Sequence, residues 1–116
     1  MRRSRLLFLN DIAESIESIR TYVGNRSFEE FSADRMRLDA VVRNFEIIGE
    51  AVKNLDEELK SQFPSTDWKG VAGFRDTLIH GYFGIDKEIL WDIITRKIPA
   101  LEQEIRIIIE FEKKRE

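Results

Sequence analysis

The residue types most able to do chemistry in this chain gather in residues 75–82. This segment holds the single histidine of the 116-residue chain, His80, with Arg75 five positions before it and Tyr82 two positions after it. Histidine both gives and takes a proton near neutral pH, because its ordinary pKa is about 6.5. The guanidinium of an arginine stays charged and binds two phosphate oxygens at once. Together the two residue types point to phosphodiester chemistry.

The same residues also have a simpler interpretation, because a lone histidine near a helix end often caps the helix or lies on the surface. On a regular helix, at roughly 100° per residue, positions 75 and 80 would lie about 140° apart and would not share a face. Arg75 and His80 can therefore act together only if the helix unwinds near Gly81, or if a second chain supplies the other half of the site.

The composition limits the kinds of site that the chain can build. It contains no cysteine, which excludes disulfides, thiolate metal sites and cysteine nucleophiles and fits a reducing cytosol. One histidine per chain argues against a histidine-based zinc site within one chain, so we expect no metal and no cofactor. The net charge is −3, whereas proteins that bind long stretches of nucleic acid are usually basic. Any contact with RNA is therefore expected to be local.

The apolar runs near the two ends of the chain are short. Residues 6–9 are followed by Asn10, Asp11 and Glu14, which interrupt the run too early for a signal peptide. Residues 107–109 form a run far shorter than a membrane span. We expect a cytoplasmic protein without a membrane segment, and one domain over residues 1–116.

The spacing of apolar residues predicts an all-α fold, an antiparallel bundle of four to five helices. Ser27 and Glu30 have the spacing of a capping box at the start of a long helix. Pro99 lacks an N–H and is expected to bend the last helix or to start a new one. The expected helical segments are residues 5–23, 27–55, 56–63, 68–80 and 86–111.

Two features of the predicted helices suggest close packing or a partner. Gly49 lies beside the apolar stripe of the 27–55 helix. Glycine in a helix interior costs about 1 kcal/mol relative to alanine, so we expect it to permit a close backbone approach. Ile107 and Phe111 widen the apolar face of the last helix, which predicts a second packing partner. That partner is either a second copy of the chain or the chain's own core.

Several segments resemble a known family. Residues 75–82 match the R-x4-H-x-Y signature of HepT-like toxins, a branch of the HEPN superfamily. Residues 39–51 resemble the central helix of that family, including its Ile-Gly-Glu-Ala element. The family also tends to place a tryptophan where Trp68 opens the helix that carries Arg75. The resemblance continues in its C-terminal half, at Asp86, Trp91 and residues 98–101.

The resemblance implies a specific activity and a specific partner. HepT-like proteins are homodimeric helical bundles with metal-independent endoribonuclease activity, and the R-x4-H residues of two chains line a cleft at the dimer interface. They are the toxins of type VII toxin–antitoxin systems, and their antitoxin is a minimal nucleotidyltransferase that can transfer AMP to the tyrosine of the motif. For this chain the resemblance implies catalytic roles for Arg75 and His80 and an AMP-acceptor role for Tyr82, with RNA as substrate.

Other residues are candidates for support or for the core. Asp76 is expected to orient Arg75 or to help the helix, and either Arg43 or Asn44 to line the cleft. Glu46 and Glu50 lie four apart on one helix face. Such paired carboxylates can bind a metal, but a solvated or salt-bridged surface is the expected role. The core is expected to hold Trp68, Phe74 and Trp91.

Two other functions compete with the nuclease hypothesis. A catalytically inactive HEPN protein could serve as the binding subunit of a nucleotidyltransferase complex, and the acidic net charge favours that alternative. A purely structural helical dimer would leave the motif in residues 75–82 unexplained. The presence of both Arg75 and His80 favours the ribonuclease.

Overall fold

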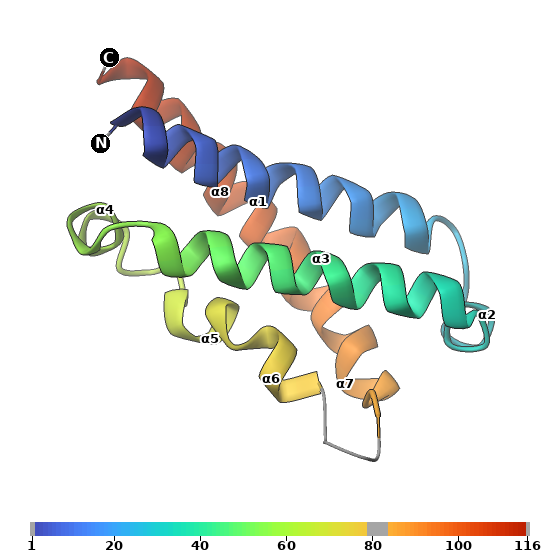
Figure 1. The fold of residues 1–116 in the computed structure, drawn as a ribbon. Helices are drawn as coiled ribbons and strands as arrows, with labels where there is room; N and C mark the ends of the chain where they lie inside the picture. The colour runs from blue at the N-terminus through green and yellow to red at the C-terminus, as the bar shows by residue number, and fades with distance from the viewer. Residues whose placement is uncertain (1, 79–83, 116) are drawn as a thin grey trace.

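The chain forms a bundle of helices in a computed structural model that describes residues 2–78 and 84–115 (Figure 1). Within these ranges it forms no β-strand, so the predicted all-α class is confirmed. None of the helices there is both long and apolar enough to cross a membrane. The helices are α1 (Arg2–Val23), α2 (Phe28–Ser32), α3 (Arg35–Asn54), α4 (Glu57–Gln62), α5 (Trp68–Ala72), α6 (Phe74–Leu78), α7 (Lys87–Asp92), the π-helix η2 (Ile93–Lys97) and α8 (Ile98–Lys114).

Three long helices form the body of the bundle. Helix α3 runs antiparallel to α1, and α8 runs back beside α1, so that both ends of the chain lie at the same end of the molecule (Figure 1). The short helices α5 and α6 pack against α3. Helix α6, which carries Arg75, is therefore held by the central helix of the fold.

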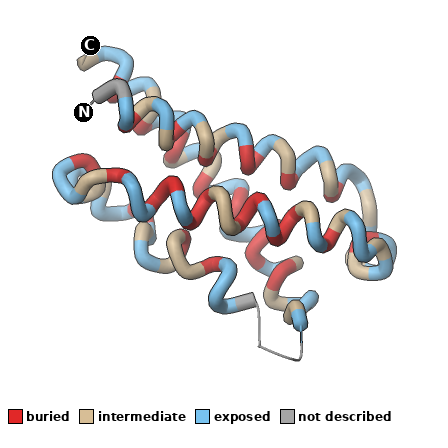
Figure 2. The backbone as a smooth tube through the Cα atoms, in the orientation of Figure 1, coloured by how far each residue is buried: buried red, intermediate tan, exposed pale blue. Residues whose placement is uncertain are grey.

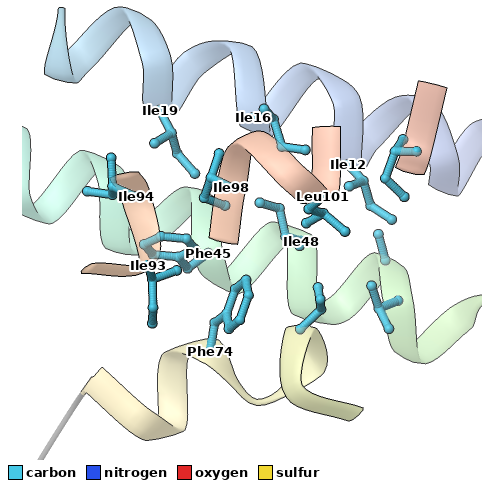
Figure 3. Packing of buried hydrophobic residues seen from close by; sticks show 14 of the residues in the cluster. Ile12, Ile16, Ile19, Phe45, Ile48, Phe74, Ile93, Ile94, Ile98 and Leu101 are labelled. Atoms are coloured by element: carbon cyan, nitrogen blue, oxygen red, sulfur yellow. The ribbon is translucent and has the colours of Figure 1, made fainter. Parts of the chain in front are cut away.

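The apolar faces of these helices meet in one core. Buried residues recur along the inner faces of α1 and α3 (Figure 2), and side chains from α1, α3, α6, η2 and α8 interdigitate (Figure 3). Phe74 is buried in this core, and Trp68 and Trp91 pack against it, as predicted. The largest fully buried side chains are Leu9, Ile12, Ile16, Ile19, Phe31, Phe45, Ile48, Leu59, Leu90, Ile105 and Ile108.

The predicted helix over residues 27–55 is wrong in one respect, because it is two helices. The capping box of Ser27 and Glu30 is present at the start of α2. Asp34 then leaves the helical conformation, and its carboxylate accepts a hydrogen bond from the Arg37 amide at 3.2 Å, which starts α3. An aspartate side chain competes for backbone N–H groups in this way and favours a helix start over a helix interior.

The predicted helix over residues 68–80 is also divided. Asp67 caps α5 by accepting a hydrogen bond from the Gly70 amide at 3.1 Å. Helix α5 ends at Ala72 with Gly73 as its C-cap, and α6 starts at Phe74. Glycine has a low helix propensity, which explains the break. His80 lies outside the described residues.

The turn before Pro99 is wider than an α-helical turn. Helix α7 is capped by Asp86 and continues into η2, where the Ile98 amide donates to the Ile93 carbonyl five residues back. Pro99 lies in the first turn of α8, where its missing N–H costs nothing. Of the two outcomes predicted for Pro99, a bend or a new start, the structure places it at the beginning of α8, which continues from η2 without a break in the helical backbone.

The apolar surface of α8 is only partly covered. Phe111 packs edge-on against Phe63, with ring centroids 5.2 Å apart, and stays 39% exposed. Ile107 is 63% exposed. The chain's own core therefore covers Phe111 in part and leaves Ile107 exposed, and a second copy as partner for this face stays a prediction.

Gly49 brings α3 and α5 into direct contact. A Cβ atom at this position would lie 2.9 Å from the Ala72 carbonyl oxygen, closer than van der Waals contact allows. The predicted close backbone approach is confirmed. Because α5 leads directly into α6, this contact also sets how far Arg75 lies from α3.

Substitution Gly49→Ala is expected to lower the free energy of unfolding by about 1 kcal/mol. Alanine improves helix propensity by about 1 kcal/mol, but overpacking against a fixed backbone costs roughly 1–3 kcal/mol. Urea unfolding followed by circular dichroism measures the difference. Gly73→Ala is the matched control, since its Cβ would meet the nearest atom at an ordinary 3.5 Å. A Gly49→Ala variant as stable as wild type would contradict the close contact.

An ion cluster joins the ends of α1, α4 and α8. The guanidinium of Arg5, which is buried, donates to Asp56 at 2.8 Å and to the fully buried Glu112 at 3.4 Å. Burial raises the pKa of Asp56, but hydrogen bonds from Arg5 and from the Leu59 amide, with the charges of Arg5 and Arg115, outweigh it and hold that pKa below its ordinary value.

This lowered pKa predicts acid sensitivity. Unfolded Asp56 binds a proton at a higher pH than folded Asp56, so the stabilisation is present above the ordinary aspartate pKa of about 3.9 and is lost as the pH falls through the folded pKa. Asp56→Asn keeps an N-cap acceptor for α4 and removes the titration. Its free energy of unfolding should fall less steeply than that of wild type between pH 5 and pH 2.

The control is Asp39→Asn, which removes an exposed carboxylate 3.5 Å from Arg35. Exposed pairs of this kind contribute little to stability, so this variant should keep the wild-type pH dependence. An Asp56→Asn variant with the wild-type pH dependence would contradict the assignment to Asp56.

Candidate active site

Arg75 is held against the central helix by its neighbours on α6. The preceding residue, Phe74, is buried and packs edge-on against Phe45 of α3, with ring centroids 5.7 Å apart. The next residue on each helix then forms a polar contact, in which the Nε of Arg75 donates to an Oε2 of Glu46 at 3.1 Å. A buried aromatic pair and an ion pair thus lie side by side.

Arg75 remains accessible despite this contact. Its side chain is 46% exposed, and that of Glu46 is 38% exposed. The Nη1 of Arg75 lies 4.0 Å from an Oδ1 of Asp76, which is an ion-pair contact but too long for a hydrogen bond. Among the described residues, Glu46 is the only acceptor that Arg75 engages by a hydrogen bond.

Arg75 borders a groove of about 490 Å³. The polar side of α3 supplies most of its lining, α1 contributes Phe8 and Asp11, and the segment of α5 and α6 contributes Ala72, Arg75 and Asp76. The α3 residues in the lining are Arg43, Phe45, Glu46, Ile47, Gly49, Glu50, Ala51, Lys53 and Asn54. The groove is therefore a surface on which Arg75 and the polar side of α3 meet.

Charges of both signs lie in the groove. The cationic side chains are those of Arg43, Lys53 and Arg75, and the acidic ones are those of Asp11, Glu46, Glu50 and Asp76. A groove with this composition has no general attraction for a polyanion, because attraction at a distance follows the summed charge. A phosphate would be bound here by a few local donors.

The structure separates the predicted supporting residues. Arg43 is exposed and lines the groove. Asn44 is buried, its Nδ2 donates to the Ala40 carbonyl of its own helix at 2.8 Å, and it does not line the groove. Asp76 lines the groove beside Arg75. Of the three predicted supports, two lie with Arg75.

The second half of the predicted site is not described. His80, Gly81 and Tyr82 fall within residues 79–83, outside the described ranges, so the predicted roles of His80 and Tyr82 stay predictions. In the part of the chain that is described, no group of three or more histidine, aspartate or glutamate residues is arranged to hold a metal ion.

Sequence reasoning missed one partner of Arg75. Glu46 was expected to be a solvated or salt-bridged carboxylate, but its partner was not predicted. The two residues are 29 positions apart, and no helical periodicity links positions that distant. The available signal was Gly49 on the same helix, which marks the place where α5 approaches α3.

Known proteins similar to this chain agree on one family. A "putative RNase" of Methanocaldococcus jannaschii is 47% identical over 102 residues, which cover 88% of this chain and 84% of that protein. The "probable ribonuclease HepT" of Thermococcus cleftensis is 43% identical over 88% of this chain and 93% of its own length. A "putative RNase" of Caldanaerobacter subterraneus is 42% identical over 91% of this chain and 95% of its own length.

No solved structure matches the chain significantly. The sequence model of one protein family, described as "Ribonuclease HepT-like", matches residues 12–108. These residues include all of α3, α5, α6 and α7, and with them Arg75 and most of the groove. This chain belongs to the ribonuclease HepT-like family.

Proposed function

We propose that this chain is a metal-independent endoribonuclease that acts as the toxin of a type VII toxin–antitoxin pair. The observation that carries the proposal is the exposed guanidinium of Arg75 at the border of a polar groove, in a chain of the ribonuclease HepT-like family. Arg75 is the first residue of the R-x4-H-x-Y motif, so the groove lies where that motif begins.

RNA carries the nucleophile for this reaction. His80 takes the proton of a 2′-hydroxyl, the 2′-oxygen forms a bond to the adjacent phosphorus, and the bond from phosphorus to the 5′-oxygen breaks. The departing 5′-oxygen takes up a proton, and the products are a 2′,3′-cyclic phosphate and a 5′-hydroxyl. General acid–base catalysis of this kind contributes about 10²–10⁴-fold to a rate. Arg75 stabilises the charge on the phosphorane-like transition state through donors that are already in place.

A homodimer would supply the second proton-transfer group. Each chain holds one histidine, so two chains provide one base and one acid. Positions 75 and 80 would lie on different faces of a regular helix. A dimeric cleft would remove this difficulty, because Arg75 of one chain could act together with His80 of the other. The exposed Ile107 on α8 shows that part of the apolar surface remains uncovered in a single chain.

Tyr82 would be the point of control. A minimal nucleotidyltransferase would transfer AMP from ATP to its hydroxyl, so that the phenolic oxygen bonds to the α-phosphorus, pyrophosphate leaves and the hydroxyl proton is released. The added AMP is a bulky anion beside Arg75 and His80, and it would repel the RNA backbone, much as a phosphate group does. Glycines at 81 and 84 flank Tyr82, which suits a segment that must enter another enzyme's site.

One observation favours a different function. The groove has four acidic side chains beside three cationic ones, and the whole chain has a net charge of −3. A catalytically inactive HEPN subunit that binds a nucleotidyltransferase would need no attraction for RNA. The two functions differ in what the loss of His80 does to RNA.

Substitution His80→Ala should abolish RNA cleavage. Purified wild-type protein without AMP on Tyr82 is expected to cut a defined RNA in the presence of EDTA, and His80→Ala should slow cleavage at least about 100-fold, since the proton-transfer group is gone. Gel electrophoresis of end-labelled RNA measures the rates. Equal thermal unfolding and equal mass in solution show that the variant still folds and associates.

A wild-type protein that leaves RNA intact, while binding a minimal nucleotidyltransferase with or without His80, would contradict the ribonuclease and support the binding subunit. Intact-mass spectrometry beforehand confirms that Tyr82 is unmodified. Cleavage that needs an added metal ion would contradict the metal-independent mechanism.

Modification by AMP should depend on one tyrosine. Incubation with a minimal nucleotidyltransferase and ATP is expected to add AMP to the wild-type chain and to stop RNA cleavage, because the anion blocks the cleft. Tyr82→Phe should receive none. The chain has one other tyrosine, Tyr22 on α1, and Tyr22→Phe is the matched control that should be modified normally. Mass spectrometry of the intact chain decides, and AMP on Tyr82→Phe would refute the assignment.

A further inference from the structure

We propose that Glu46 is a positioning residue for Arg75. Its carboxylate holds the guanidinium by the Nε–H, and the edge formed by Nη1 and Nη2 is left to receive two phosphate oxygens. This inference rests on the proposed function, since it concerns how Arg75 meets RNA. It assigns a role to a residue outside the R-x4-H-x-Y motif.

The hydrogen bonds of Arg75 show which of its donors Glu46 occupies. A guanidinium has five N–H donors in a rigid fork, and in the described structure only the Nε–H is used, by Glu46 at 3.1 Å. The Nη1 of Arg75 lies 4.0 Å from an oxygen of Asp76, beyond hydrogen-bond range. A guanidinium can pair with phosphate in a bidentate way, and with the Nε–H bound to Glu46 the edge with the two Nη groups is the one that remains for such a pair.

Buried contacts fix the backbone on both sides of the pair formed by Glu46 and Arg75. Exposed ion pairs are usually weak because two long side chains must be ordered at once. Here the preceding residues, Phe45 and Phe74, are buried in contact with each other, and Gly49 holds α5 against α3 one turn away. Because the backbone of both partners is fixed by buried contacts, Glu46 can orient Arg75 with little additional ordering.

The charge of Glu46 has an opposite effect on RNA. It offsets the charge of Arg75 and so weakens the attraction for phosphate at a distance, while the hydrogen bond places the donors correctly. Glu46→Gln retains an oxygen acceptor and removes the charge, and Glu46→Ala removes both. The positioning effect and the charge effect can therefore be separated by these two variants.

Glu50 provides the matched control. It is exposed, lines the same groove one helical turn further along α3, and forms no ion pair with Arg75. Removing its carboxylate changes the charge of the groove by the same amount as removing that of Glu46. A loss that appears with Glu46→Ala and not with Glu50→Ala is due to positioning.

The kinetic test measures kcat and KM for a defined RNA. Glu46→Ala should lower kcat about 10-fold or more, because a misplaced catalytic group costs up to roughly 10²-fold. Glu46→Gln should keep kcat within about twofold, and both variants should lower KM because an anion has been removed from the groove. Glu50→Ala should lower KM to a similar extent and should lower kcat much less than Glu46→Ala does. Equal kcat values for Glu46→Ala and Glu50→Ala would overturn the proposal.

A second measurement does not depend on activity. The Nε–Hε signal of Arg75 in an NMR spectrum, identified by its loss in Arg75→Lys, should exchange slowly with water in the wild type. It should exchange faster in Glu46→Ala and remain slow in Glu50→Ala. If the wild type cuts no RNA, the proposed function fails, and this signal still decides whether Glu46 holds Arg75. If the wild type cuts RNA and the Nε–Hε proton exchanges at the same rate in wild type and Glu46→Ala, the positioning role is refuted.

Discussion

The contact between α3 and the segment of α5 and α6 is the constraint on which the site depends. It consists of the close approach at Gly49, where a Cβ would lie 2.9 Å from the Ala72 carbonyl oxygen, and the edge-on packing of Phe45 on Phe74. Both contacts are made by groups that cannot shift easily, a helix backbone and buried rings. They fix the backbone position of Arg75 relative to α3. The 3.1 Å hydrogen bond from its side chain to Glu46 follows from that position.

The electrostatics of the groove suit a brief and local contact with RNA better than tight binding. Acidic side chains outnumber cationic ones in its lining, so affinity cannot come from counterion release over many phosphates. A ribonuclease that must cut and release gains little from ground-state affinity, because only interactions that strengthen in the transition state raise kcat. An Arg75 that is oriented in advance fits this requirement.

Sequence patterns predicted the elements but not every break between them. Apolar periodicity identified the buried faces of α1 and α3, and the spacing of Ser27 and Glu30 identified the capping box at the start of α2. The breaks at Asp34 and Gly73 were missed because a local cap and a flexible residue overrode periodicity that continued on both sides. The pair of Glu46 and Arg75 depends on tertiary packing over 29 positions, which no local pattern contains. The roles of His80 and Tyr82 rest on the family motif.

The most direct test of the central claim, that the chain cuts RNA by attack of the substrate's own 2′-hydroxyl, uses one chemical change in the substrate. Cleavage of a defined RNA is first mapped in EDTA, and the same RNA is then made with a single 2′-deoxynucleotide on the 5′ side of the mapped bond. The mechanism predicts that this bond is no longer cut and that the unmodified RNA leaves a 2′,3′-cyclic phosphate end. Cleavage of the 2′-deoxy bond at an unchanged rate would contradict it.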